Sequence, residues 1–291
     1  MLYATAARLS THVHMTDYFG IYLARWRLTP DGAPIFTHSS KLLPVRWKGQ
    51  AAMLKVTESV EERAGALVMV AWAGHGAARV LAHGEDALLM ERAEGIASLA
   101  DLARSGADDT ASRIICGVVE KLHAHQHGAS WCSVVSLDHW FRELDPAAVR
   151  YGGVLSLAAD TARYLLATSQ EAVVLHGDIH HGNILDFGPR GWLAIDPKGL
   201  MGERGFDYAN LFCNSDHEMA TKPGRFLRQL DVVAQAAALP RVRLLQWVLA
   251  YAGLSAAWTL GDGNKPETAL SVAELAAKEL REIETGRKSS S

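Results

Sequence analysis

The sequence predicts an α+β protein with two unequal lobes, a small antiparallel sheet with one helix over residues 1–92 and a larger, mainly helical part over residues 93–291. Before Gly95, short runs of strand-forming residues alternate with turn signals, whereas after it apolar residues recur at helical spacing. We expect the connection near residues 91–95 to act as a hinge. With 49% hydrophobic residues in 291, the chain can bury cores of this size.

The N-terminal lobe is expected to contain three strand runs and one helix. The strand runs are Tyr22 to Leu28, Ala51 to Val56 and Val80 to Met90, and the helix covers Ser59 to Trp72. The helix begins with Ser-Val-Glu-Glu, a capping box that places Glu62 at its third position.

The C-terminal lobe is expected to be built from five long helices around one short β segment. The β segment covers Val173 to Asp196. The helices are Thr110 to Gln126, Ala147 to Thr168, Arg225 to Ala238, Val242 to Leu260 and Thr268 to Glu284.

Composition excludes several classes of partner and site. The chain has 29 basic and 32 acidic residues without charge blocks, so neither a nucleic acid nor an anionic membrane is expected as the main partner. Three scattered cysteines, Cys116, Cys132 and Cys213, argue against disulfides or a zinc ribbon. Neither a signal peptide nor a membrane span is apparent, so we expect a cytoplasmic protein.

Two aspartates within the β segment compete for a metal-binding role. Asn183 to Phe187 and Trp192 to Asp196 are predicted to form a hairpin around Gly-Pro-Arg-Gly. Symmetric pairing places Asn183 opposite Asp196, with their side chains on one face, and sends Asp186 to the other face. A bulge at Gly191 would shift this register by one residue.

Asp178, Asn183 and Asp196 together have the chemistry that phosphoryl transfer from Mg-ATP needs. Mg²⁺ prefers oxygen ligands, which Asn183 and Asp196 supply, and a further carboxylate, Asp178, must be aimed at the acceptor hydroxyl. We therefore predict Asp178 as the catalytic residue and ATP and Mg²⁺ as cofactors.

The arrangement HGD-x-x-x-x-N followed by Asp196 resembles the catalytic loop and D-F-G element of protein kinases. More closely, HGDIHHGNIL and GWLAIDPKGLMGERGFDYAN resemble the aminoglycoside phosphotransferases, particularly the branch of streptomycin 6-phosphotransferase and hydroxyurea phosphotransferase. The resemblance implies a two-lobed protein-kinase-like fold. It also implies that Lys55 binds ATP, that Glu62 pairs with Lys55, and that the backbone of Glu91 and Ala93 holds adenine.

The resemblance does not determine which segment covers the phosphates of the nucleotide. The phosphate-covering loop is expected around Thr16 to Leu23, which has one glycine, and Thr37 to Gln50 looks like an extra stretch. Glu62 fits a capping role as well as an ion pair with Lys55, and the two remain equally weighted.

Several histidines and one aspartate have competing interpretations. We expect His176 and His181 to be structural, while His180 stands where many protein kinases carry a phosphate-contacting lysine. We favour a solvated helix end over a metal site for His123, His125 and His127. Asp207 is expected to anchor a helix start or the catalytic loop.

An active small-molecule kinase is the leading functional hypothesis. Only ten residues separate Asp196 from Asp207, too few for the peptide-docking segment of a protein kinase. A kinase for hydroxyurea or a housekeeping metabolite and a nucleotide-binding regulatory pseudokinase remain alternatives. The segment 201–220 has four carboxylates, Glu203, Asp207, Asp216 and Glu218, which we interpret either as a wall that attracts a cationic acceptor of streptomycin type or as ordinary surface and caps.

Overall fold

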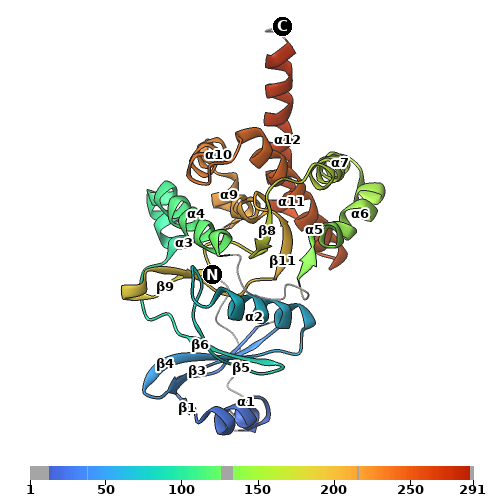
Figure 1. The fold of residues 1–291 in the computed structure, drawn as a ribbon. Helices are drawn as coiled ribbons and strands as arrows, with labels where there is room; N and C mark the ends of the chain where they lie inside the picture. Colours follow the sequence, from blue (N-terminus) through green and yellow to red (C-terminus); the bar gives the residue numbers. More distant parts are fainter. Residues whose placement is uncertain (1–12, 38, 126–133, 215, 289–291) are drawn as a thin grey trace.

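The computed structural model describes residues 13–37, 39–125, 134–214 and 216–288. A strand-rich part lies at one end of the molecule and a larger helical part at the other (Figure 1), as expected. The main sheet is antiparallel, in the order β1-β3-β4-β6-β5 with β2 beside β3. Its strands are β1 (Thr29–Pro30), β2 (Ile35–Phe36), β3 (Lys41–Trp47), β4 (Gln50–Val56), β5 (Val80–His83) and β6 (Ala87–Glu91).

The first element corrects one prediction. Residues 22–28, expected as a strand, belong mostly to helix α1 (Val13–Trp26). Phe19, Tyr22 and Trp26 lie on one face of this helix and pack with the sheet residues Leu43 and Leu54. A seven-residue run with alternating apolar residues fits either period, and burial of this face against the sheet selects the helix.

Helix α2 (Val60–Trp72) confirms the expected helix and connects the two parts. The Ser59 hydroxyl accepts a hydrogen bond from the backbone N–H of Glu62, which caps the helix start. Val68, Met69 and Trp72 pack into the large core of the helical part. A Cβ atom at Gly65 would fall 1.8 Å from the carbonyl oxygen of Pro197, so only glycine allows this close approach.

The expected helices of the larger part are present, with one break. The run 147–168 is divided between α6 and α7 by Gly152 and Gly153, which have φ of 64° and 60°. The helices are α3 (Leu99–Leu102), η1 (Ala103–Ala107), α4 (Asp108–Ala124), α5 (Leu137–Trp140), η3 (Phe141–Glu143), α6 (Leu144–Tyr151), α7 (Val154–Ala167), α8 (Phe206–Ala209), η5 (Asn210–Cys213), α9 (His217–Thr221), α10 (Arg225–Ala236), α11 (Arg241–Gly261) and α12 (Glu267–Lys288).

Two small sheets hold the segment 172–203 within the helical part. Strand β11 (Leu200–Glu203) pairs with β7 (Val135–Ser136) and β8 (Ala172–Leu175), and β9 (Ile184–Asp186) pairs with β10 (Trp192–Ala194). Helix α11 is buried over most of its surface and forms the centre of the core behind these sheets. Among the helices that the structure describes, none has the length and apolar character to cross a membrane.

Candidate active site

The segment 176–183 joins β8 to β9 and is held from behind by Asp207. The Asp207 carboxylate, on α8, accepts hydrogen bonds from the backbone N–H groups of His176, at 2.9 Å, and Gly177, at 2.7 Å. Gly177 has φ of 82°, and a Cβ atom there would meet the Leu200 side chain at 2.8 Å. The prediction that Asp207 anchors this loop or a helix start is confirmed for the loop.

Asp178 presents a carboxylate whose orientation is fixed by two amides. Asn210 Nδ2 donates to one carboxylate oxygen at 3.0 Å, and Asn183 Nδ2 lies 3.3 Å from the other. Asn214 in turn donates to Asn210 Oδ1 at 2.9 Å, which fixes the direction of that amide. The side chain of Asp178 remains 31% exposed, so a substrate hydroxyl can reach it. Asn210 was not identified from sequence, although it ends the GFDYAN motif.

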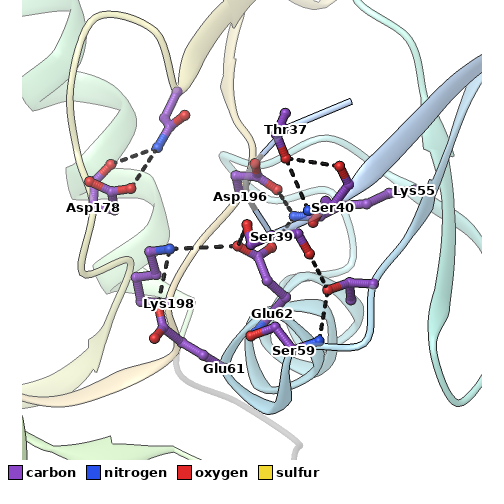
Figure 2. A network of polar contacts seen from close by, with 12 residues as sticks. Thr37, Ser39, Ser40, Lys55, Ser59, Glu61, Glu62, Asp178, Asp196 and Lys198 are labelled. Carbon is purple, nitrogen blue, oxygen red and sulfur yellow. Dashed lines mark hydrogen bonds and ion pairs between the residues drawn. The ribbon is translucent and has the colours of Figure 1, made fainter. Parts of the chain in front are cut away.

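Lys55 is buried on β4 and pairs with two carboxylates at once (Figure 2). One partner is Glu62 from α2 and the other is Asp196 from the loop after β10. Burial acts to raise the pKa of Glu62, but Lys55, together with Lys198, outweighs it and holds this pKa below its ordinary value. Of the two roles weighed for the Glu62 side chain, the structure shows the ion pair: its carboxylate binds Lys55, and the Ser59 N–H that a capping-box glutamate would hold donates to Thr57 Oγ1 at 3.1 Å.

The predicted pairing of Asn183 with Asp196 is wrong by one residue. The N–H of Ile195 donates to the carbonyl of Asn183 at 2.9 Å, and Trp192 lies opposite Asp186. The shift arises at the connection, where Gly188–Arg190 form a 3₁₀ turn (η4) and Gly191 has φ of 74°.

Asp196 reaches the site through its own backbone conformation. Its φ is 61°, in the left-handed region, where aspartate is one of the few residues other than glycine found routinely. The side chain therefore does not follow strand alternation, and its carboxylate points to Lys55 (Figure 2).

Asp186 has a structural role outside this cluster. Its carboxylate accepts hydrogen bonds from the N–H groups of Gly188, at 2.8 Å, and Ala97, at 3.3 Å. Its backbone carbonyl accepts from Gly95, where a Cβ atom would fall 2.0 Å from Asp186 Cγ. Asp186 thus ties the β9–β10 hairpin to the connection between the two parts.

Glu91 and Ala93 lie at the expected hinge and line a cavity of about 150 Å³. The Glu91 side chain is turned to Arg190 and to the N–H of Arg79. Most of the cavity lining is apolar, which suits a flat aromatic ring. The lining also includes Leu42, Met53, Met90, Arg92, Leu185, Phe187, Ile195 and Asp196.

The loop over the Lys55 cluster is not where the sequence was expected to place it. Residues 16–23 lie within α1, whereas the loop that joins β2 to β3 begins at Thr37, in the stretch expected to be extra. Ser39 Oγ donates to Glu62 at 3.0 Å, and the Thr57 hydroxyl donates to the Ser39 carbonyl at 2.7 Å. This hydroxyl-rich loop is drawn beside Lys55 in Figure 2.

The histidines of the catalytic segment differ in role. His176 and His181 are buried, but only His176 has the hydrogen bonds expected of a satisfied structural residue, since neither ring nitrogen of His181 has a partner among the described residues. His176 Nδ1 accepts from the Asp178 N–H at 3.2 Å, and its Nε2 lies 2.8 Å from the Ile195 carbonyl. Nδ1 of His180 accepts from the Gly182 N–H at 3.0 Å, which leaves Nε2, 4.0 Å from Asp178, to carry the proton of a neutral ring.

The expectation of a solvated end for α4 is wrong for His123. Its side chain is 8% exposed, and its Nε2 lies 2.8 Å from the Asp207 carboxylate that anchors the catalytic loop. His125 stacks on His75 with ring centroids 4.0 Å apart. His127 lies outside the described residues, and the described part of the chain contains no cluster of three or more metal-ligating side chains.

Only two of the four carboxylates considered for an acidic wall over residues 201–220 lie at the surface. Glu203 is 3% exposed and binds Arg243 and the Trp247 indole N–H, and Asp207 is buried beneath the catalytic loop. Asp216 and Glu218 are exposed, but Asp216 caps α9 and pairs with Arg104. The interpretation as caps and internal anchors fits better.

Comparison with known sequences agrees with this geometry. Residues 25–263 match the model of a family described as aminoglycoside/hydroxyurea antibiotic resistance kinase. The chain is 48% identical to a streptomycin 3″-kinase of Klebsiella pneumoniae, over 83% of this chain and 92% of the relative. It is 31% identical to a streptomycin 6-kinase of Streptomyces griseus, over 88% and 85%. It is 30% identical to a hydroxyurea phosphotransferase of Kitasatospora aureofaciens, over 87% and 76%.

Solved structures share the fold. An aminoglycoside phosphotransferase, APH(4)-Ia, in complex with ADP and hygromycin B superimposes with a TM-score of 0.61 at 15% identity, covering 90% of this chain and 97% of that one. A choline kinase of Streptococcus pneumoniae gives 0.60 at 12% identity, covering 92% and 99%. The two-lobed kinase-like fold is therefore confirmed. With its family model matching most of the residues and its relatives covering most of the chain, the protein is a small-molecule kinase that belongs to the aminoglycoside/hydroxyurea antibiotic resistance kinase family.

Proposed function

We propose that this kinase transfers the γ-phosphate of Mg-ATP to a hydroxyl of streptomycin and so confers resistance to it, in the cytoplasm, where ATP is available. The observation that carries the proposal is the oriented, accessible carboxylate of Asp178 together with the ion pair between buried Lys55 and the half-exposed Asp196. The relatives named for streptomycin supply the acceptor. Because they are named for two positions, 3″ and 6, the proposal names the acceptor and not the hydroxyl.

The groups beside Lys55 fit the triphosphate end of ATP. The Lys55 ammonium would hold phosphate oxygens, with Glu62 keeping it in place. Asn183 and Asp196 offer an amide and a carboxylate oxygen, the hard ligands that Mg²⁺ prefers, and would hold the ion together with phosphate oxygens. Mg²⁺ would supply neutralisation of the charge that develops on the transferred group. The backbone of Glu91 and Ala93 would hold adenine in the apolar cavity beside it.

Asp178 would act mainly by placing the acceptor oxygen. Its two amide donors fix its direction, so it can accept the proton of the acceptor hydroxyl as the new P–O bond forms. Phosphoryl transfer depends on such positioning more than on a strong base.

The test is an ADP-release assay of the purified protein with streptomycin, hydroxyurea and small amino alcohols, with product mass and NMR assignment of the phosphorylated hydroxyl. We expect turnover with streptomycin, and we expect Asp178→Asn to lower it by about 10²-fold or more at an unchanged melting temperature. Turnover with hydroxyurea or a metabolite but not with streptomycin would replace the proposed acceptor. Stabilisation by ATP without any turnover would indicate the regulatory pseudokinase instead.

A further inference from the structure

A second cavity, of about 540 Å³, lies next to the catalytic loop and away from the adenine cavity. It is bounded by α5 and η3, the end of α11, the start of α2 and the loop after Asp196. Figure 1 shows α5 beside one end of α11, on the side of the molecule opposite hairpin β9–β10. Its lining consists of Glu61, Trp140, Arg142, Glu143, Lys198, Trp258, Gly261 and Asp262.

Lys198 connects this cavity to the reaction centre. It follows Asp196 by two residues and packs against the catalytic loop. A Cβ atom built on Gly177 would lie 3.1 Å from the Cβ atom of Lys198. Figure 2 shows Lys198 next to Asp178 and Glu61. Lys198 is thus the lining residue that borders the catalytic loop, since its N–H also donates to the His176 carbonyl at 2.7 Å, and a molecule in the cavity would reach Asp178 past this side chain. The adenine cavity is lined from the other side, by Glu91, Ala93 and Asp196.

Two tryptophans form the aromatic side of the cavity. Trp140 and Trp258 pack edge to face, with ring centroids 5.4 Å apart and an interplanar angle of 76°. Both indoles are partly buried against the core and both line the cavity, so part of each ring can contact a ligand. The Trp140 Nε1 atom is buried without a hydrogen-bond partner among the described residues. Flat cations stack on such rings.

The charged residues of the lining are negative in sum, with Glu61, Glu143 and Asp262 against Arg142 and Lys198. The two basic lining residues are neutralised, Arg142 by Glu143 at 3.2 Å and Lys198 by Glu61 at 3.0 Å. Within the described part of the chain, Asp262 has no ion-pair partner. It also follows the last residue of the 21-residue helix α11, whose C-terminal carbonyls carry partial negative charge.

We propose that this cavity is the acceptor site and that it recognises a guanidinium group, stacked on Trp258 and Trp140 and held by Asp262. The inference rests on the proposed function and adds the residues that select the acceptor. Size supports a large ligand, because 540 Å³ falls within the range for drug-sized molecules, whereas hydroxyurea has only a handful of heavy atoms. Charge supports a cation. Streptomycin, whose cyclitol bears two guanidinium groups, fits both requirements.

The experiment compares Asp262→Asn, Trp258→Leu and Trp258→Phe with the wild type and with Glu218→Gln, which removes an exposed carboxylate outside the cavity. Binding of streptomycin and of streptidine, its bis-guanidinium fragment, is measured calorimetrically, and KM is measured for streptomycin and for ATP. We expect Trp258→Leu and Asp262→Asn to weaken both guanidinium ligands by about tenfold, with Trp258→Phe in between. The Asp262 variant should also lose much of the salt dependence of binding, while Glu218→Gln and the KM for ATP stay unchanged.

The outcomes separate the two proposals. If the wild type phosphorylates streptomycin and the three cavity variants bind it as tightly as Glu218→Gln does, the cavity assignment is overturned and the function stands. If streptomycin is neither bound nor phosphorylated, the proposed function is wrong. Binding of streptidine that depends on Asp262 would in that case still support the cavity as a guanidinium site. Failure of the wild type to bind streptidine overturns the cavity assignment as well. If Trp258→Leu lowers the melting temperature, the cavity assignment is judged from Asp262→Asn instead, because Asp262 is exposed and its substitution should leave the fold intact.

Discussion

Asp186, at the end of β9, and Asp196, in the loop after β10, should separate stability from activity when each is replaced by asparagine. The substitution keeps the shape of the side chain and is tolerated at the positive φ of Asp196. Asp196→Asn removes a charge that would bind Mg²⁺, a contribution of several kcal/mol to transition-state stabilisation, so turnover should fall by about 10³-fold. Its effect on stability should be small, since Lys55 keeps Glu62 as a partner.

Asp186→Asn should show the opposite pattern. Its carboxylate accepts two backbone N–H bonds, from Gly188 and Ala97, and an amide can accept only through its single oxygen. One of these two backbone N–H groups would then face the side-chain NH₂ of the asparagine, which is itself a donor. At this partly exposed position the loss is about 1 kcal/mol, which lowers the melting temperature of a protein of this size by about 2–4 °C. Turnover should remain within about threefold of the wild type, because the change does not reach Asp178 or Lys55.

The assay pairs steady-state ADP release with thermal unfolding of both variants, and the aspartate-to-asparagine change at exposed Asp231 serves as a control. If Asp186→Asn abolishes turnover while Asp196→Asn retains it, the assignment based on the left-handed conformation of Asp196 is wrong. Loss of both activities at unchanged stability would show that the hairpin acts as one catalytic unit.

Three further changes test other parts of the site. Lys55→Met should raise the KM for ATP and lower turnover, and it should also lower the melting temperature because Glu62 stays buried without its main partner. An unchanged ATP titration would place the nucleotide lysine elsewhere. His123→Leu should lower kcat by about tenfold at constant KM for ATP, because Asp207 then loses its side-chain partner beneath the catalytic loop. His123→Gln, which can still donate to Asp207, should retain most of the wild-type rate. If His123→Leu changes only the melting temperature, His123 has a structural role alone. Burial lowers the pKa of His181 to about 4, so between about pH 6.5 and 4 the unfolded chain binds the extra proton and the folded state loses stability, by about 2 kcal/mol between pH 7 and 5. Urea unfolding at pH 7 and 5 should show a smaller difference in His181→Leu.

The sequence carries the order of the functional residues but not the contacts between distant ones. Asp178, Asn183 and Asp196 are recognisable because they lie within one short segment with fixed spacing. His123 and Asp207 are 84 residues apart, and nothing in the local pattern around either one shows that α4 and α8 meet beneath the catalytic loop. For this reason a helix end that looks solvated in sequence is an internal anchor in the fold.

Backbone geometry explains the remaining differences. The hairpin register depends on a 3₁₀ turn closed by Gly191, and a Gly-Pro-Arg-Gly sequence is compatible with more than one turn type. The strand expected over residues 22–28 became a helix because burial of Phe19 and Tyr22 decides between two periods that a short run cannot distinguish. Carboxylate-rich composition likewise did not show that Glu203 turns inward to Arg243.

The loop Asp196–Lys198 links the nucleotide side of the site to the acceptor side through α2. Asp196 binds Lys55, the Pro197 carbonyl sits against Gly65, and Lys198 pairs with Glu61 and Glu62. These contacts hold α2 in the position where Glu62 and Lys55 are paired. In a regulated protein kinase that ion pair depends on a phosphorylated activation segment. Here ten residues lead from Asp196 to Asp207, and the partners that fix α2 lie within the first three of this loop, so the paired state needs no modification to form. An enzyme of this family can therefore act on its substrate as soon as the substrate binds, because the catalytic ion pair is already formed.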